Sequence, residues 1–440
     1  MGAYSIVLVL LTIAIWLSSV AKRINFPYPV LLLLAGIAVG FIPRFGLISI
    51  EPEVVFLLFL PPVLYDAAYN IPFREFKQNI RIISVLAFAL VFATTIAIAI
   101  CAHFIIGMQW SLSFVLGAIL SPPDAIAATG ITKGLNLPHR TKIVLEGESL
   151  INDASALVAF RFAVAAVAGA VFVPTQAIVL FFVALLGGGL LGYLLALLFI
   201  RIDRHLADND ATVALNLLLP FVAYLMAEEL HVSGVIAVVV LGLSISRKKN
   251  YLPEKSIAQS KSVLQTVVSI LNGLVFILIG LEFSQVIKNI PSNSFLPLII
   301  CAFLIFIVAL VIRMIVIFYH KISTKRRLDH ISQRINSFDK EQLEWINNHR
   351  SRNRINTNKL DEYKSLLLDT KEALIIGWSG MRGIVSLAAA LSLPLIMENG
   401  EKFPHRNTII FLTVTVVIIM LIVQGLGLPM LVKHLKFEEK

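Results

Sequence analysis

Carboxylate side chains recur inside apolar stretches of this sequence. Asp124 ends the Ser-Pro-Pro-Asp segment at 121–124, Asp153 ends the Glu-Ser-Leu-Ile-Asn-Asp segment at 148–153, and Asp66 directly follows Leu-Pro-Pro-Val-Leu-Tyr. Ionisable groups at membrane depth are costly, and they usually mark an ion or proton pathway. The sequence therefore predicts a membrane transporter rather than a receptor or an anchor.

The two aspartates Asp124 and Asp153 are predicted to meet near the middle of a membrane. Asp153 lies about 11 residues into the apolar segment that starts near Lys142, which is roughly 16 Å of helix. Asp124 lies about 14 residues into the preceding segment, which runs in the opposite direction. Because the hydrocarbon core is about 30 Å thick, both carboxylates are expected near its midplane, where they are the predicted ligands of a cation.

The neighbours of these aspartates suit a small alkali cation. Pro122 and Pro123 lack amide protons and free upstream carbonyls, so an unwound backbone with hard oxygen ligands is expected at Pro123. Ser149 lies four residues before Asp153 and therefore shares its helix face. The residues themselves thus predict ion ligands at Asp153, Asp124, Ser149 and Pro123.

A buried ion pair is predicted beside this site. Glu148 needs a partner, because a lone buried carboxylate is very costly, and Arg382 in a later apolar segment is the expected one. Asn152 would support the pair by hydrogen bonding. Arg313 lies near an inner end and is expected to snorkel to the surface. Arg161 lies toward the outer side and receives no role.

Composition places these groups in a polytopic membrane protein. Of the 440 residues, 58% are hydrophobic and only 15% are charged, and the mean hydropathy is +0.86; soluble domains average about 25% charged residues. Cys101 and Cys301 lie in apolar runs and are expected to be buried small hydrophobes. The glycines at 187–192 fit close helix packing, and neither a zinc-protease nor a phosphate-binding motif is present. We therefore expect no enzyme activity, no cofactor and no nucleic-acid partner.

Apolar runs long enough to cross a bilayer predict about 13 transmembrane helices. The predicted location is the plasma membrane. The N-terminus is placed outside the cell and the C-terminus in the cytoplasm, because most Lys and Arg residues then lie on the cytoplasmic side. The loops on the outer side hold only Arg44, Lys288, Lys402 and Arg406. The predicted spans are 4–21, 28–49, 53–70, 82–106, 110–131, 143–172, 176–200, 211–229, 231–246, 262–284, 295–319, 372–396 and 407–432.

An odd number of spans predicts two inverted repeats of six helices joined by a linker helix. The fifth span in each repeat carries a helix breaker, Pro122-Pro123 in the first and the glycine-rich 377–383 in the second, so two crossed broken helices are expected. The predicted organisation is spans 1 to 11 in 1–319, a cytoplasmic linker in 320–371, two spans in 372–433 and a short cytoplasmic tail in 434–440. Leu343 is expected on an amphipathic helix of the linker.

These segments resemble the monovalent cation/proton antiporters, in the electroneutral branch of the bacterial NhaP-type antiporters and the animal sodium–hydrogen exchangers. The strongest match is the region 114–163, which holds Ser-Pro-Pro-Asp-Ala and Gly-Glu-Ser-Leu-Ile-Asn-Asp. The segments 60–69, 231–237 and 380–385 also match. The resemblance implies the all-helical NhaA-like antiporter fold and a homodimer in the lipid bilayer, with a dimer domain and a mobile core domain.

The resemblance also implies a role for each residue of the site. By this resemblance, Asp153 is the carboxylate that holds either a proton or a cation, and the ion-binding residues around it are Asp124, Ser149 and Asp66. Glu148 and Arg382 are expected to form a bracing pair with Asn152 beside it. One departure is that Pro123 stands where many relatives have Thr or Val before the aspartate, so a Thr ligand is absent.

The expected function is exchange of Na+ or Li+ for H+ by alternating access, one ion for one proton and without net charge movement. A K+/H+ antiporter of the same fold is the alternative, because the sequence does not decide which cation is carried. An intramembrane aspartyl protease is the remote alternative, since Tyr65-Asp66 lies in a span, but Asp124 lacks the Gly-x-Gly-Asp setting that this chemistry needs.

Overall fold

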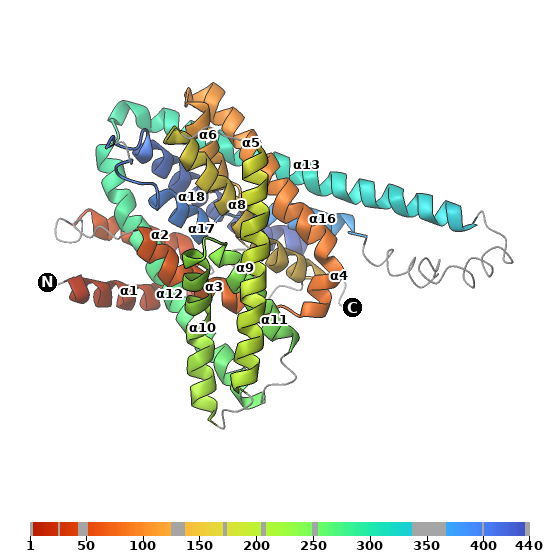
Figure 1. Cartoon of the computed structure of the whole chain (residues 1–440). Helices are drawn as coiled ribbons and strands as arrows, with labels where there is room; N and C mark the ends of the chain where they lie inside the picture. Colours follow the sequence, from red (N-terminus) through yellow and green to blue (C-terminus); the bar gives the residue numbers. More distant parts are fainter. Residues whose placement is uncertain are drawn as a thin grey trace.

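The chain is a bundle of α-helices (Figure 1). The computed structural model describes residues 3–24, 27–42, 52–124, 137–169, 174–203, 208–248, 254–336, 367–397 and 400–435. Within these ranges the backbone is helical or irregular, and the extended pairing is confined to an isolated bridge between Ile396 and Lys402. The predicted all-α membrane fold is confirmed.

Each predicted span contains helix in the described residues. Seven helices are long and apolar enough to cross a membrane, and four shorter apolar helices accompany them. The number of crossings stays a prediction. The helices are α1 Ala3–Ile24, α2 Tyr28–Gly40, α3 Pro52–Asn70, α4 Phe73–Ser84, α5 Val91–Cys101, α6 Trp110–Leu120, α8 His139–Val167, α9 Pro174–Asp203, α10 Asn209–Glu229, α11 Gly234–Arg247, α12 Glu254–Asn289, α13 Phe295–Asn336, α16 Thr370–Trp378, α17 Ile384–Leu391 and α18 Arg406–Leu435. A π-helical segment, Val85–Leu90, joins α4 to α5, and a second one, Ala102–Ile106, extends α5, so that Phe73–Ile106 is one continuous helical rod.

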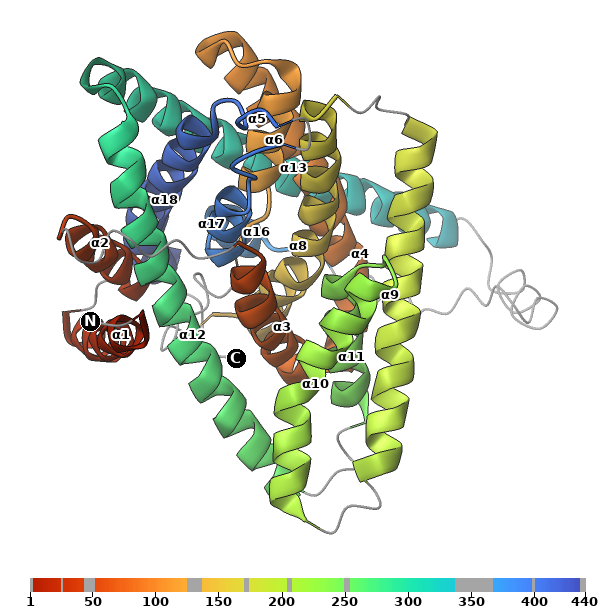
Figure 2. The ribbon, with the colours of Figure 1, turned by 60° about the vertical axis from the view of Figure 1, so that its left-hand side comes forward.

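The helices form two groups by their packing. The first, called the scaffold group, consists of α1, α2, α3, α9, α10, α11 and α12, with α2 lying along α12 and α11 packed on α9 and α3. The second, called the core group, consists of α4, α5, α6, α8, α13, α16, α17 and α18, with α6 packed on α5 and α8. Figure 2 shows most of the core group above α3, α10 and α11.

Glycines hold the scaffold group together at close range. A side-chain carbon added at Gly36 of α2 would lie 2.1 Å from the Ile277 carbonyl oxygen of α12, and one added at Gly192 of α9 would lie 2.1 Å from the Ala237 oxygen of α11. Lipid is as apolar as a side chain, so helices in membranes associate by such close packing rather than by the hydrophobic effect. The prediction that the glycines at 187–192 serve helix packing is confirmed, because Gly187, Gly188 and Gly192 all contact α11 or the residues that precede it.

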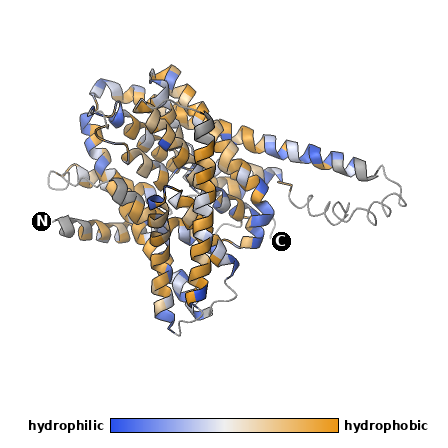
Figure 3. Ribbon diagram, viewed as in Figure 1, coloured by the Kyte–Doolittle hydropathy of each residue, from blue (hydrophilic) through white to orange (hydrophobic). Residues whose placement is uncertain are grey.

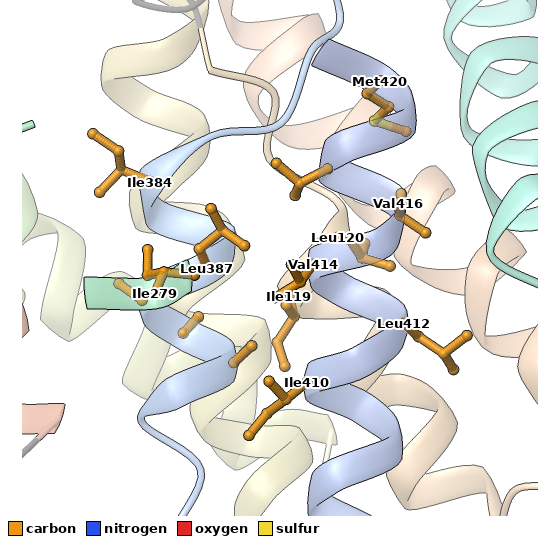
Figure 4. Packing of buried hydrophobic residues seen from close by; sticks show 14 of the residues in the cluster. Ile119, Leu120, Ile279, Ile384, Leu387, Ile410, Leu412, Val414, Val416 and Met420 are labelled. Carbon is orange, nitrogen blue, oxygen red and sulfur yellow. The ribbon is translucent and has the colours of Figure 1, made fainter. Parts of the chain in front are cut away.

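The core group packs its short helices against one long helix. Figure 4 shows Ile119 and Leu120 of α6 and Leu387 of α17 close to α18. All three side chains are fully or almost fully buried. The residues of α18 that share this packing are Ile410, Leu412, Val414, Val416 and Met420. This contact fixes the ends of the two short helices that carry the candidate site.

Helix α13 continues beyond its predicted span. It runs without a break from Phe295 to Asn336, so the first part of the predicted linker is helical. Figure 3 shows this end projecting from the bundle with mostly hydrophilic residues, in contrast to the apolar rods of the bundle. Leu343, predicted on an amphipathic helix, lies outside the described residues. The domain boundaries stay a prediction.

Candidate ion-binding site

Two interrupted helices cross at the centre of the core group. α6 ends at Leu120 and is followed by non-helical residues through Asp124, while α16 ends at Trp378 and α17 begins at Ile384. The backbone N–H of Asp124 donates to the Met381 carbonyl at 2.6 Å, which joins the two interruptions. Prolines at 122 and 123 have no N–H to continue α6, which explains why the chain unwinds there. The predicted meeting of the two helix interruptions is observed up to Asp124, and residues 125–136, which follow it, lie outside the described part of the chain.

A glycine lets Asp124 approach the second interrupted helix. A side-chain carbon at Gly383 would lie only 1.7 Å from Asp124 Oδ2, so residue 383 has no room for a larger side chain. The N–H of Ile384, the first residue of α17, donates to the same oxygen at 3.3 Å. Helix N-termini favour negative charge, so the start of α17 is a suitable place for this carboxylate.

Helix α8 brings Asp153 and Asn152 to the crossing. Asp153 is 5% exposed, and Asp124 is its charged neighbour. The side-chain N–H of Asn152 donates to the Pro123 carbonyl at 2.8 Å, which ties α8 to the unwound segment. Asn152 is fully buried, and its Oδ1 has no hydrogen-bond donor among the described residues. Two carboxylates, one amide oxygen and one backbone oxygen thus gather here, and all are hard oxygen ligands.

The predicted partner of Glu148 is wrong. Arg313 of α13, and not Arg382, donates to both carboxylate oxygens of Glu148, at 2.5 and 2.8 Å. Both side chains are 2% exposed. Arg313 does not snorkel, because α13 extends well past it and holds its side chain inside the bundle, where its Nε also donates to the Ile376 carbonyl at 3.0 Å. Such a two-point pair is among the strong hydrogen-bonded contacts in proteins.

Arg382 instead supports the crossing itself. Its Nε donates to the Leu120 carbonyl at the end of α6 at 2.8 Å, and one terminal nitrogen donates to the Gly380 carbonyl at 2.6 Å. The last carbonyls of a helix have no partner within the helix and carry partial negative charge. The buried guanidinium of Arg382 therefore satisfies the broken end of α6 and adds positive charge next to the aspartates.

Two further predicted ligands, Ser149 on α8 and Asp66 on α3, are half-buried. Ser149 is half-buried, one turn before Asp153. Asp66 on α3 is half-buried and accepts a hydrogen bond from the Asn70 side chain at 2.8 Å. Its charged neighbour on α8 is Glu146, two residues before Glu148. The proximity of Asp66 to Asp153 stays a prediction. The complete set of ion ligands also stays a prediction.

Comparison with known proteins decides the family of this chain. The family described as sodium/hydrogen exchanger, transmembrane, matches residues 7–434. The chain belongs to this exchanger family. It is 35% identical over 444 residues to an uncharacterized Na+/H+ exchanger of Mycobacterium tuberculosis, with 99% of this chain and 75% of that protein covered.

Other relatives of this exchanger carry more specific names. The chain is 30% identical to the Na+/H+ antiporter NhaH of Halobacillus dabanensis, covering 98% of this chain and 97% of that one. It is 32% identical to the sodium, potassium, lithium and rubidium/H+ antiporter of Bacillus subtilis, covering 98% of this chain and 62% of that one. The solved structure of the sodium proton antiporter MjNhaP1 from Methanocaldococcus jannaschii has the same fold, with a TM-score of 0.73, 18% identity and 98% coverage of both chains.

Membership of this family makes the exchanger a multi-pass membrane transporter, and it leaves no support for the aspartyl protease alternative. Among the described residues, His, Cys, Asp and Glu do not form a group of three that could hold a metal ion.

The positions of two residues in the exchanger, Arg313 and Glu146, were not predicted from the sequence. Arg313 was placed at the surface because its span was ended at 319, and a longer helix would have placed it inside. Glu146 was passed over although it lies seven residues before Asp153, which puts the two on one face of α8. That spacing, together with its charge, was the available signal.

Proposed function

We propose that this protein exchanges one Na+ for one H+ across the membrane by alternating access, with Asp153 holding either ion. The observation that carries this proposal is the buried Asp153 next to Asp124 at the crossing of two interrupted helices, one of which is tied to α8 through Asn152. Cation and proton compete for one carboxylate, so each excludes the other and the two flows are coupled.

The charges at the crossing support exchange without net charge movement. Arg313 neutralises Glu148, and Arg382 lies in the crossing that also holds Asp124. Of the carboxylates at the crossing itself, Asp153 is then the one whose charge is left for a mobile ion. Either a single H+ or a single Na+ balances it, so the loaded site carries the same charge in both directions.

The cation is held in this proposal by oxygen atoms from both interrupted segments. Asp153 and Asp124 supply carboxylates, Ser149 a hydroxyl group and Pro123 the second lone pair of its carbonyl. The buried Oδ1 of Asn152, which lacks a donor in the described part of the chain, is a further oxygen at the same place. Asp66 contributes from the side of α3. Glu148 and Arg313 brace the site without binding the ion.

A K+/H+ antiporter is the second candidate. It is favoured by one observation, the 32% identity to the Bacillus subtilis protein whose name includes sodium, potassium, lithium and rubidium. A homodimer in the plasma membrane, with its N-terminus outside and its C-terminus in the cytoplasm, completes the proposal. The alternation of basic loops supports that orientation.

Transport by the purified protein in liposomes tests the proposal. A pH-sensitive dye inside the liposomes reports H+ movement when Na+, Li+ or K+ is added outside, and Asp153→Asn serves as the control. We expect Na+ to drive H+ movement in the wild type only. Clamping the potential at about 100 mV would bias a cycle that moves one net charge by about 2.3 kcal/mol. An exchange rate that follows the clamped potential contradicts the electroneutral cycle.

A further inference from the structure

The inner half of α8 has one narrow face that reaches solvent. From Thr141 to Leu150 most side chains are buried, and the half-buried ones are Lys142, Glu146 and Ser149. Spacings of four and three residues put these three on a single helix face. The next position on this face is Asp153, which is 5% exposed, and the following residues 154–156 are buried again. The solvent-reaching face therefore ends at the ion site.

Helix α3 forms the opposite wall of this face. Asp66 and Asn70 are half-buried, while the neighbouring Ala68 and Tyr69 are buried. α3 and α8 are in contact (Figure 2), and Asp66 and Glu146 are close enough to influence each other's charge. The two carboxylates thus lie on the helices α3 and α8, which are in contact across the boundary between the scaffold group and the core group.

Glu146 differs from Glu148, which lies two residues later on α8, in its bonding. Glu148 is locked by Arg313, whereas the Glu146 carboxylate has neither a hydrogen bond nor an ion pair in the part of the chain that the structure describes. Its charged neighbours are Lys142, His139 and Asp66. Holding a half-buried carboxylate without a partner costs free energy, and a role in structure alone does not account for that cost.

We infer that the face of Lys142, Glu146 and Ser149 is the inner access path to Asp153, and that Glu146 is its cation-attracting residue. The inference rests on the proposed exchange function and adds a residue that governs cation entry. Seven residues of helix separate Glu146 from Asp153, which is about 10 Å. A unit charge at that distance changes the occupancy of a cation site by about 2- to 10-fold, depending on the local dielectric.

The expected signature is a change in the KM for Na+ on the cytoplasmic side. Glu146→Gln should raise this KM by about 2- to 10-fold and leave kcat within about twofold. Lys142→Gln, which removes the opposite charge from the same face, should lower the KM by a smaller factor. Glu146→Asp should restore the wild-type KM. Glu75→Gln is the matched control, because Glu75 lies at the same end of the bundle but on α4, where it contacts His139, and we expect no change.

Salt provides a second readout that a structural defect would not reproduce. The Debye length falls from about 30 Å at 0.01 M salt to about 10 Å at 0.1 M. The difference in KM between the wild type and Glu146→Gln should therefore shrink as choline chloride is added. A difference that is insensitive to choline chloride contradicts attraction by charge.

Chemical labelling tests the path without relying on transport. Single cysteines are placed at 145, 146, 149 and 150 in a background in which Cys101 and Cys301 are changed to alanine, and inside-out vesicles are treated with a membrane-impermeant maleimide. We expect labelling of Glu146→Cys and Ser149→Cys, and none of Leu145→Cys or Leu150→Cys, which replace buried leucines.

The two experiments separate the failure of this inference from failure of the proposed function. If the wild type exchanges Na+ for H+ but Glu146→Gln keeps the wild-type KM, the role of Glu146 is refuted. Equal labelling at 145, 146, 149 and 150 refutes the path. If the wild type shows no exchange with any alkali cation, the proposed function fails, and the labelling pattern still decides whether this face of α8 reaches solvent. Should Glu146→Gln not fold, Lys142→Gln and Glu146→Asp supply the comparison of KM values.

Discussion

Removing Arg313 should destabilise this protein far more than removing any exposed arginine. Arg313 makes two hydrogen bonds to Glu148, at 2.5 and 2.8 Å, and both side chains are 2% exposed. Arg313→Ala would leave the Glu148 carboxylate buried without a partner. Breaking a buried pair in this way costs about 3–5 kcal/mol, which lowers the folding equilibrium constant by more than about a hundredfold.

The matched control is a second arginine–glutamate pair on the same helix α8. Arg161 donates to both oxygens of Glu228 on α10, each at 3.0 Å, but its side chain is 63% exposed. Exposed pairs contribute about 0.2–1 kcal/mol. Arg161→Ala should therefore change the thermal midpoint little, although its pair, like that of Arg313, has two hydrogen bonds.

Thermal unfolding in detergent, followed by intrinsic fluorescence at one scan rate, measures the difference. The double variant Glu148→Leu, Arg313→Met removes both charges, and it should recover much of the stability lost in Arg313→Ala. It should also keep exchange activity if the pair only braces the site. Equal midpoints for Arg313→Ala and Arg161→Ala would refute the reasoning, because burial would then not decide the cost.

Three further predictions concern the ion site. Asp153→Asn should abolish exchange while the protein still folds, since it removes the carboxylate that alternates between ions; near-normal exchange by well-folded protein would contradict this. The apparent KM for Na+ should rise about tenfold for each unit of acidification below the pKa of the site, and a KM that stays constant across the titration would exclude direct competition. Gly383→Ala should strongly reduce exchange, because its new carbon would lie 1.7 Å from Asp124 Oδ2. The control is Gly107→Ser, at a glycine with open space around it. Because Gly107 has a positive φ, this control loses some stability, and exchange rates are therefore compared for folded protein.

The positions of the helices along the chain, and of their interruptions, were predictable from the sequence. Hydropathy located the helices, because a membrane-crossing segment must satisfy its backbone internally and be apolar along its length. The positions of Pro122, Pro123 and the glycine-rich 377–383 were enough to predict two interrupted helices. The meeting of Asp124 and Asp153 followed from their depth, because depth is set by residue count at 1.5 Å per residue.

Choices that depend on helix rotation were not predictable in the same way. Arg313 and Arg382 both lie in spans, and which of them reaches Glu148 depends on how α13 and α16 are turned toward α8. The sequence specifies the position of each residue along its helix axis, but it does not show which neighbouring helix packs against each helix face. Glu146 illustrates the same limit, because only the packed structure shows that its face is the one left open.

The glycine contacts have a consequence for where this molecule can deform. Among the described residues, every glycine whose added carbon would meet another atom closer than 3 Å faces a helix of its own group: Gly36, Gly40, Gly187, Gly188, Gly192, Gly234, Gly242 and Gly280 within the scaffold group, and Gly117, Gly147, Gly377, Gly380, Gly383 and Gly427 within the core group. Backbones that touch directly cannot slide without a clash, so each group is rigid. In the described part of the chain, no glycine contact this close crosses the boundary between the two groups, so fewer close contacts oppose a relative displacement there. The two proposed walls of the inner access path, α3 and α8, are in contact across this boundary, so a relative displacement of the two groups would change the width of the route to Asp153.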